Sequence, residues 1–67
     1  AYKKKRGLVL EVKVATKEKD IEITAQRECH QIREMNYIDG LQERGYTDII
    51  GYGIAFYKKT CVIMLAK

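Results

Sequence analysis

The sequence predicts a small α/β domain with the element order β-α-β-β, in which one long helix crosses over between two parallel strands. The chain has 67 residues, of which 46% are apolar and 33% charged, so it holds one domain with a thin core and is too apolar for a disordered segment. Residues 8–15 follow the period of a strand, 17–35 that of a helix, and 47–67 again that of strands. A strand, a crossover helix and a second strand form a right-handed parallel unit, and a final hairpin makes the three-stranded sheet mixed.

The first predicted strand has two faces of different chemistry. One face is wholly apolar and the other carries two charges, the members being Leu8, Leu10, Val12 and Val14 against Val9, Glu11 and Lys13. One long helix covers only one face of a three-stranded sheet. We therefore expect the other face to be covered either by a further part of a larger fold or by a second copy of the chain.

The helical segment carries an apolar stripe that Ile21, Ala25, Cys29 and Ile32 form and Met35 widens. Thr16 or Asp20 is suited to the N-cap. Residues 36–44 read as a second, shorter helical turn, and Gly45 is a natural stop.

The last third of the chain predicts a hairpin of two strands, 48–57 and 60–66, joined at Lys58 and Lys59. This turn lacks the Asn-Gly or Asp-Gly of an emphatic two-residue hairpin, so the sequence leaves the register open. Gly51 and Gly53 within the first of these strands indicate either a close backbone approach or a bulge.

The triplet Glu11-Val12-Lys13 carries the sharpest chemical hypothesis. Residues two apart on a strand point the same way, so the carboxylate of Glu11 and the ammonium of Lys13 share one face. The Glu11 carboxylate, together with the Val12 carbonyl, offers oxygen ligands to a cation such as Mg²⁺, and Lys13 can orient the attacking water. The alternative is an exposed ion pair of little energetic weight.

Four sequence segments, one of which contains this triplet, together indicate a relationship to a known family. They are Leu10-Glu11-Val12-Lys13-Val14, the helical stretch from Ala25 to Gln31-Ile32, Tyr37, and Tyr52-Gly53-Ile54-Ala55-Phe56. This combination resembles the C-terminal part of the PD-(D/E)XK nuclease superfamily, in particular the bacterial branch found behind AAA-type ATPase domains in uncharacterised proteins. The resemblance covers nearly everything from Gly7 to Leu65.

The resemblance implies a partial restriction-endonuclease-like core and a metal-dependent phosphodiesterase that uses Mg²⁺ or Mn²⁺ on nucleic acid. Glu11 would be the metal ligand, Lys13 the catalytic lysine, and Gln31 a helix residue beside the site, although Gln31 is equally well read as an ordinary flanking polar residue. The parent protein would carry an ATPase domain on the N-terminal side of this single domain, 1–67.

The chain departs from the superfamily pattern in two ways. The first acidic residue, an Asp on the strand before the Glu-x-Lys strand, is absent because the chain begins too late, so we expect an excised fragment without activity. Glu28 stands inside the apolar stripe where the family favours Ala. Since an unpaired buried carboxylate is costly, Glu28 should be exposed, paired or neutral, and it is a hypothetical compensating ligand. Asp48 is a weaker candidate ligand and is better explained as a solvated residue.

The charge balance supports a second hypothesis, a non-catalytic module that binds nucleic acid or protein. The net charge is +4 with a pI near 9.2, a mild bias toward polyanions. Lys3, Lys4, Lys5 and Arg6 are weak candidates for phosphate contacts, although a solvated turn before the strand is the preferred interpretation.

The histidine and the two cysteines predict no further chemistry. His30 is expected at the surface. Cys29 and Cys61 have no metal-ligand spacing and are expected as reduced, largely buried thiols of a cytoplasmic protein. No apolar run is long enough to cross a membrane.

Overall fold

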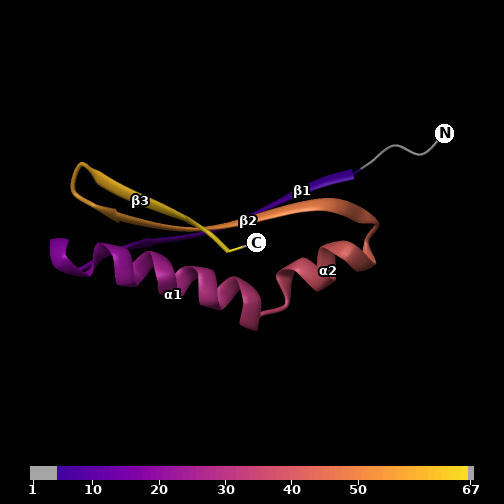
Figure 1. Cartoon of the computed structure of the whole chain (residues 1–67), viewed down its shortest axis with the longest axis horizontal. Coiled ribbons are helices and arrows are strands. Elements are labelled where there is room, and N and C mark those ends of the chain that lie inside the picture. The colour runs from indigo at the N-terminus through magenta and orange to yellow at the C-terminus, as the bar shows by residue number, and fades with distance from the viewer. Residues whose placement is uncertain (1–4, 67) are drawn as a thin grey trace.

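The computed structural model describes residues 5–66, which form a three-stranded sheet with helices on one side (Figure 1). The elements in chain order are β1 (Lys5–Val14), the short 3-10 helix η1 (Glu18–Asp20), α1 (Ile21–Glu34), α2 (Tyr37–Glu43), β2 (Tyr46–Tyr57) and β3 (Thr60–Leu65). The strand order is β1-β2-β3, with β1 parallel and β3 antiparallel to β2. This confirms the predicted mixed sheet with a crossover helix.

Strand β1 begins earlier than the sequence pattern predicts. Lys5 and Arg6 already lie in the strand, so the interpretation of these two residues as a turn before the strand is wrong. Arg6 pairs with Asp48 across the sheet, with 3.3 Å between Nε and Oδ2. The partner strand β2 extends to Tyr46 and provides the backbone for this extra length. Lys3 and Lys4 lie outside the described residues.

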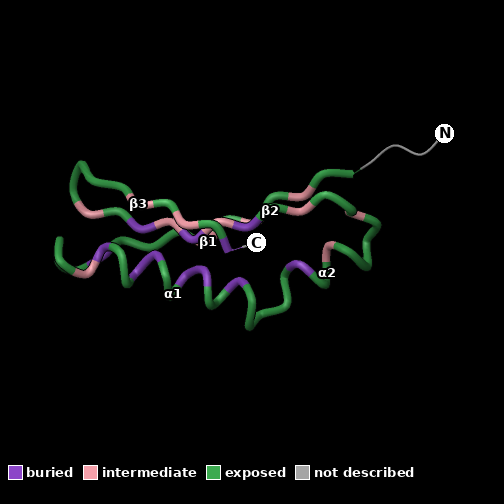
Figure 2. Tube along the Cα trace, in the orientation of Figure 1, coloured by how far each residue is buried: buried purple, intermediate pink, exposed green. Residues whose placement is uncertain are grey.

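The core lies between α1 and one face of the sheet, where Figure 2 shows the buried residues gathered. Ala25 and Ile32 of α1 and Ala55 of β2 have no exposed surface. The helix approaches β2 most closely at Gly53, because a Cβ atom there would lie only 2.5 Å from the carbonyl oxygen of Ala25. The register shift in the β1-β2 ladder lies at Lys5/Arg6, so the close approach predicted from the glycines is confirmed at Gly53 and no bulge is needed there.

The opposite face of the sheet is apolar, and no part of residues 5–66 covers it. The strand register brings side chains of all three strands onto this face, and eight large apolar ones are exposed by two fifths or more: Leu8, Leu10, Val12, Val14, Ile50, Phe56, Ile63 and Leu65. We call these eight residues the uncovered face. Monomeric soluble proteins rarely expose so much contiguous apolar surface.

The cysteines differ in their surroundings. The Cys29 thiol is buried and donates a hydrogen bond to the carbonyl oxygen of Met64 at 3.4 Å. Cys61 is exposed, so the prediction of a largely buried thiol is wrong for this residue. Its strand position opposite Phe56 places Cys61 on the side of the sheet away from both described α-helices.

The connections use three residues with positive φ. Asn36 separates α1 from α2 at φ 56°, and Gly45 follows α2 at φ 93°, as a helix stop should. Lys58 adopts φ 52° in the two-residue turn, which pairs Tyr57 with Thr60 and so defines the hairpin register that the sequence leaves open.

Candidate functional site

Glu11 and Lys13 lie on the face of β1 that α1 covers. Their partners across the parallel ladder are Gly53 and Ala55, both buried beneath the helix. Because β1 is an edge strand, the two side chains remain accessible beside the helix, with Glu11 half-buried and Lys13 exposed. The predicted pair of a carboxylate and an ammonium on one face is therefore present, at an open edge of the sheet.

The backbone of β1 places the carbonyl of Val12 at the same open edge. The amide of Ala15 donates to the carbonyl oxygen of Phe56 on β2 at 2.7 Å. Backbone groups alternate in direction along a strand, so Lys13 and Glu11 also direct theirs toward β2. Val12 therefore directs its carbonyl away from β2, where it has no partner strand among the described residues.

Helix α1 presents Glu28 and Gln31 on its flank toward β1. The other flank is fixed by two contacts to the far end of the chain, from Cys29 to the Met64 carbonyl and from Arg33 Nε to the Ala66 carbonyl at 3.2 Å. Helical periodicity then puts Glu28 and Gln31 on the side of the other sheet edge, which is β1. Gln31 is exposed and thus accessible from the site.

Glu28 is neither exposed nor paired within residues 5–66, which rules out two of the three states expected for it. The residue is only 5% exposed, and it makes no ion pair or side-chain hydrogen bond with the part of the chain that the structure describes. Its place between Ala25 and Ile32 on the buried stripe explains the burial, because the backbone of α1 packs tightly on β2 at this level.

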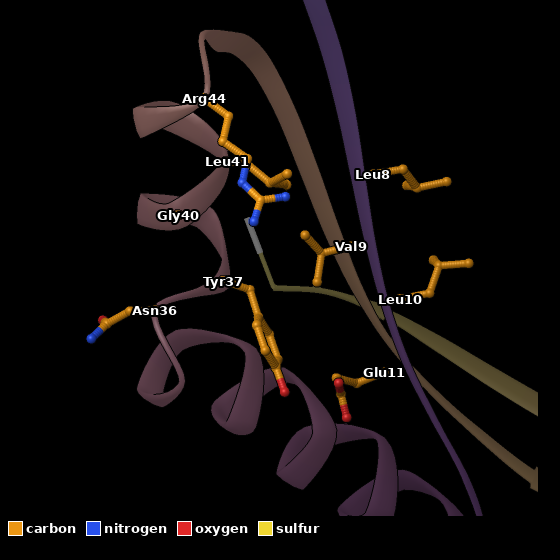
Figure 3. Close-up of a pocket in the computed structure, with 9 residues that line it drawn as sticks. All are labelled: Leu8, Val9, Leu10, Glu11, Asn36, Tyr37, Gly40, Leu41 and Arg44. Atoms are coloured by element: carbon orange, nitrogen blue, oxygen red, sulfur yellow. The ribbon is translucent and has the colours of Figure 1, made fainter.

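A groove of about 590 Å³ lies between β1 and α2, and Figure 3 shows the residues around it. Glu11 lies at the end nearest α1, together with the hydroxyl end of Tyr37. The guanidinium of Arg44 extends into the groove from the end of α2, whereas the side chains of Leu8 and Leu10 point away from it. The groove therefore combines a carboxylate, a phenol and a guanidinium.

Sequence reasoning missed Arg44 altogether and used Tyr37 only as one of several matching segments. The signal was the spacing of Tyr37, Leu41 and Arg44, which puts them on one face of a helix. A seven-residue helix is too short for this stripe to stand out without knowing which strand it faces.

The comparison with protein families decides the relationship. The family model for the PD-(D/E)XK nuclease superfamily matches residues 1–65. The chain belongs to this superfamily. No curated protein and no solved structure matches the chain in the other two comparisons. Among the described residues, no helix is long and apolar enough to cross a membrane.

PD-(D/E)XK nucleases generally use divalent metals. The residues present offer ligands of the right chemical type for such an ion, but too few of them. The Glu11 carboxylate and the Val12 carbonyl are both the oxygen ligands that Mg²⁺ prefers. Residues 5–66 hold no group of three or more His, Cys, Asp or Glu side chains that could bind a metal together. Asp48 cannot join Glu11, because its register with Arg6 places it on the opposite face of the sheet.

The remaining surface predictions are simple. His30 is exposed, as expected, and its Nε2 lies 2.9 Å from Oε1 of Glu34, one helical turn later. Lys5 lies 5.8 Å from the ring centre of Tyr46, and Arg6 is engaged with Asp48. Neither of these two basic residues lines the groove.

Proposed function

We propose that the chain is the C-terminal part of a metal-dependent nuclease domain that hydrolyses phosphodiester bonds of nucleic acid. One observation carries the proposal: the carboxylate of Glu11 and the carbonyl of Val12 lie together at a free sheet edge, beside a groove that also holds a guanidinium. Membership of the PD-(D/E)XK nuclease superfamily supports the same reaction class.

The side chains divide the work between them. Mg²⁺ or Mn²⁺ supplies charge stabilisation at the phosphate when it is bound. Glu11 holds the ion, with the Val12 carbonyl as a second ligand. Lys13, on the same face and exposed, orients the attacking water and stabilises negative charge. Gln31, on the flank of α1 toward β1, positions the water or Lys13 through a hydrogen bond.

A second carboxylate is needed for activity. One side-chain carboxylate and one carbonyl leave Mg²⁺ short of protein ligands. In the superfamily pattern the missing group is an Asp on the strand before the Glu-x-Lys strand, and the free edge of β1 is where a further strand can pair. We therefore propose that the chain alone is inactive and that joining it to such a strand restores hydrolysis. Glu28 stays a hypothetical compensating ligand.

Paramagnetic line broadening tests this metal site directly. Mn²⁺ added to ¹⁵N-labelled protein should broaden the amide signals of Glu11, Val12, Lys13 and Gln31, and excess Mg²⁺ should reverse the effect. Glu11→Gln should abolish this broadening, whereas Glu43→Gln, a matched change at an exposed position, should leave it intact. Broadening scattered over surface carboxylates such as Glu18 and Asp20, equal in both variants, would overturn the metal site.

The second candidate function is that of a non-catalytic module that binds nucleic acid or protein. The cationic groove residue Arg44 and the net charge of +4 favour it as much as they favour a nuclease. Nucleic-acid binding that falls steeply with salt, without any response to Mn²⁺ at Glu11, would select this alternative.

Three finer assignments remain proposals. The order and spacing of the matching segments support the branch of the superfamily that follows AAA-type ATPase domains. On that ground we propose an ATPase domain in the parent protein, which the preceding coding sequence tests. The two free cysteines are consistent with a reducing compartment, so we propose a cytoplasmic location.

We further propose that the uncovered face packs against the same face of a second copy. Its eight side chains come from all three strands and carry no charge, as in the apolar core of an interface between identical chains. Two such sheets can stack face to face, as in a β-sandwich. A helix of the parent protein is the competing occupant, because sheets with parallel strands are usually covered on both faces.

A further inference from the structure

We propose that Arg44 binds a backbone phosphate of a nucleic-acid strand that lies in the groove between α2 and β1. This inference rests on the proposed function, since that function supplies nucleic acid as the ligand. It adds a binding residue that no part of the superfamily resemblance points to. Arg44 would thus hold the strand at one end of the groove, and the reacting phosphate would lie at the other end, next to the ion that Glu11 would bind.

The position of Arg44 follows from the short helix α2. Arg44 is the residue directly after its last turn, and Gly45 with φ 93° then turns the chain into β2. This fixes the base of the side chain at the rim of the groove. Leu41 and Tyr37, one and two turns earlier on the same face, line the same wall.

The guanidinium of Arg44 is available to a ligand. It forms no ion pair and no side-chain hydrogen bond with the described residues, whereas Arg6 pairs with Asp48 and Arg33 bonds to the carbonyl of Ala66. The side chain nevertheless extends into the groove instead of outward from the helix (Figure 3). A planar, permanently charged fork of N–H donors matches the oxygens of a phosphate.

The walls of the groove favour a nucleic-acid strand over a free ion. Val9 and Leu41 are apolar and half-buried, and Tyr37 adds an aromatic face with a hydroxyl at its end. An aromatic ring can stack on a base or sugar of the strand whose phosphate Arg44 holds. An acidic peptide would satisfy Arg44 alone, but its carboxylates would offer no base to stack on the ring of Tyr37.

Fluorescence anisotropy of a labelled oligonucleotide, measured in EDTA, tests the proposal without any metal or cleavage. Arg44→Gln should weaken binding about tenfold at moderate salt, the usual scale for one charge-assisted contact. The slope of log affinity against log salt should become shallower by about 0.7 for a single strand and 0.9 for a duplex. Arg44→Lys should recover part of the affinity, because the charge is kept and the fork is lost.

Arg27→Gln is the matched control, since Arg27 is exposed on α1, outside the groove, and the substitution removes the same charge. It should change affinity less than about twofold and leave the groove contact intact. Circular dichroism of both variants checks that they fold alike. Equal losses in the two variants would overturn the proposal, because the effect would then be one of net charge, and so would the absence of binding by the unmodified chain.

The two proposals fail in distinguishable ways. If Mn²⁺ broadens the Glu11 signals but Arg44→Gln behaves as Arg27→Gln does, the metal site stands and the phosphate contact is wrong. If Arg44→Gln shows its specific loss but Mn²⁺ leaves Glu11 unaffected, the phosphate contact stands and the metal site at Glu11 is wrong. If an acidic peptide competes with the oligonucleotide in the unmodified chain but not in Arg44→Gln, Arg44 serves a protein partner and the proposal is overturned.

Discussion

Gly53 of β2 lies directly beneath the backbone of α1 at Cys29, so that a Cβ atom on Gly53 would come within 2.6 Å of the Cys29 amide nitrogen. Helix and strand therefore touch backbone to backbone at the centre of the sheet. Glu11 is the neighbour of Gly53 in the parallel ladder. This one contact thus sets how far the helix carrying Gln31 stands from the strand that carries the candidate metal ligand.

We expect Gly53→Ala to destabilise the fold by about 3 kcal/mol or more, because neither backbone can yield without moving α1 off the sheet. Gly40→Ala is the control. Gly40 lies inside α2 with nothing within 4 Å of its Cβ position, so alanine there should stabilise the helix by about 0.5–1 kcal/mol. Urea unfolding followed by circular dichroism measures both, and similar effects from the two substitutions would contradict the close contact.

The uncovered face should control the association state. Sedimentation velocity over a wide range of concentrations should show a dimer that Val12→Lys dissociates, because a charge placed among apolar side chains cannot be buried in the interface. Gln26→Lys, on the exposed side of α1, should leave the dimer unchanged. A chain that stays monomeric at every concentration would refute self-association and favour a helix of the parent as the covering layer.

The two thiols should differ in reactivity by orders of magnitude. A thiol reagent such as DTNB should modify Cys61 readily and Cys29 only after unfolding, because Cys29 is 4% exposed and hydrogen-bonded to Met64. In the proposed dimer the partner also shields Cys61, so its labelling rate should fall as protein concentration rises. Rapid labelling of Cys29 in the folded chain would mean that α1 opens from the sheet.

Asn36 should tolerate glycine better than alanine. Its φ of 56° lies in the left-handed region, which Asn and Gly adopt readily and alanine adopts only at a cost in free energy. We expect Asn36→Ala to lower the free energy of unfolding by about 1 kcal/mol and Asn36→Gly to change it by less than half of that. Denaturant midpoints of the three proteins provide the measurement, and an equal loss in both variants would point to the Asn36 side chain instead of its backbone.

The elements of the fold follow from the sequence because their periodicities do not conflict. The alternation over residues 8–15 and the stripe formed by Ile21, Ala25, Cys29 and Ile32 predict β1, α1 and the parallel pairing. The sequence does not reveal the early start of β1, because Lys5 and Arg6 look like a solvated turn. Only the extra length of β2, with Asp48 opposite Arg6, makes them strand residues.

The candidate site was less predictable, since it depends on tertiary neighbours. Glu11 and Lys13 could be found from a local pattern, and the structure adds that Val12 presents its carbonyl at the free edge. Arg44 could not be found, because nothing in the sequence shows that α2 stands against β1. Glu28 is buried because α1 packs closely on Gly53 of β2. The apolar stripe of the helix alone does not reveal this close packing.

The free edge of β1 and the uncovered face next to it also affect the tendency of the protein to aggregate in solution. Residues 8–15 combine high β-propensity with few charges, the composition of segments that nucleate amyloid-like fibrils. Lys13, exposed at the edge, is the side chain best placed to oppose intermolecular strand pairing. Lys13, which is proposed for catalysis, would then also protect the strand from aggregation. Replacing it would lower the solubility of the protein as well as its activity.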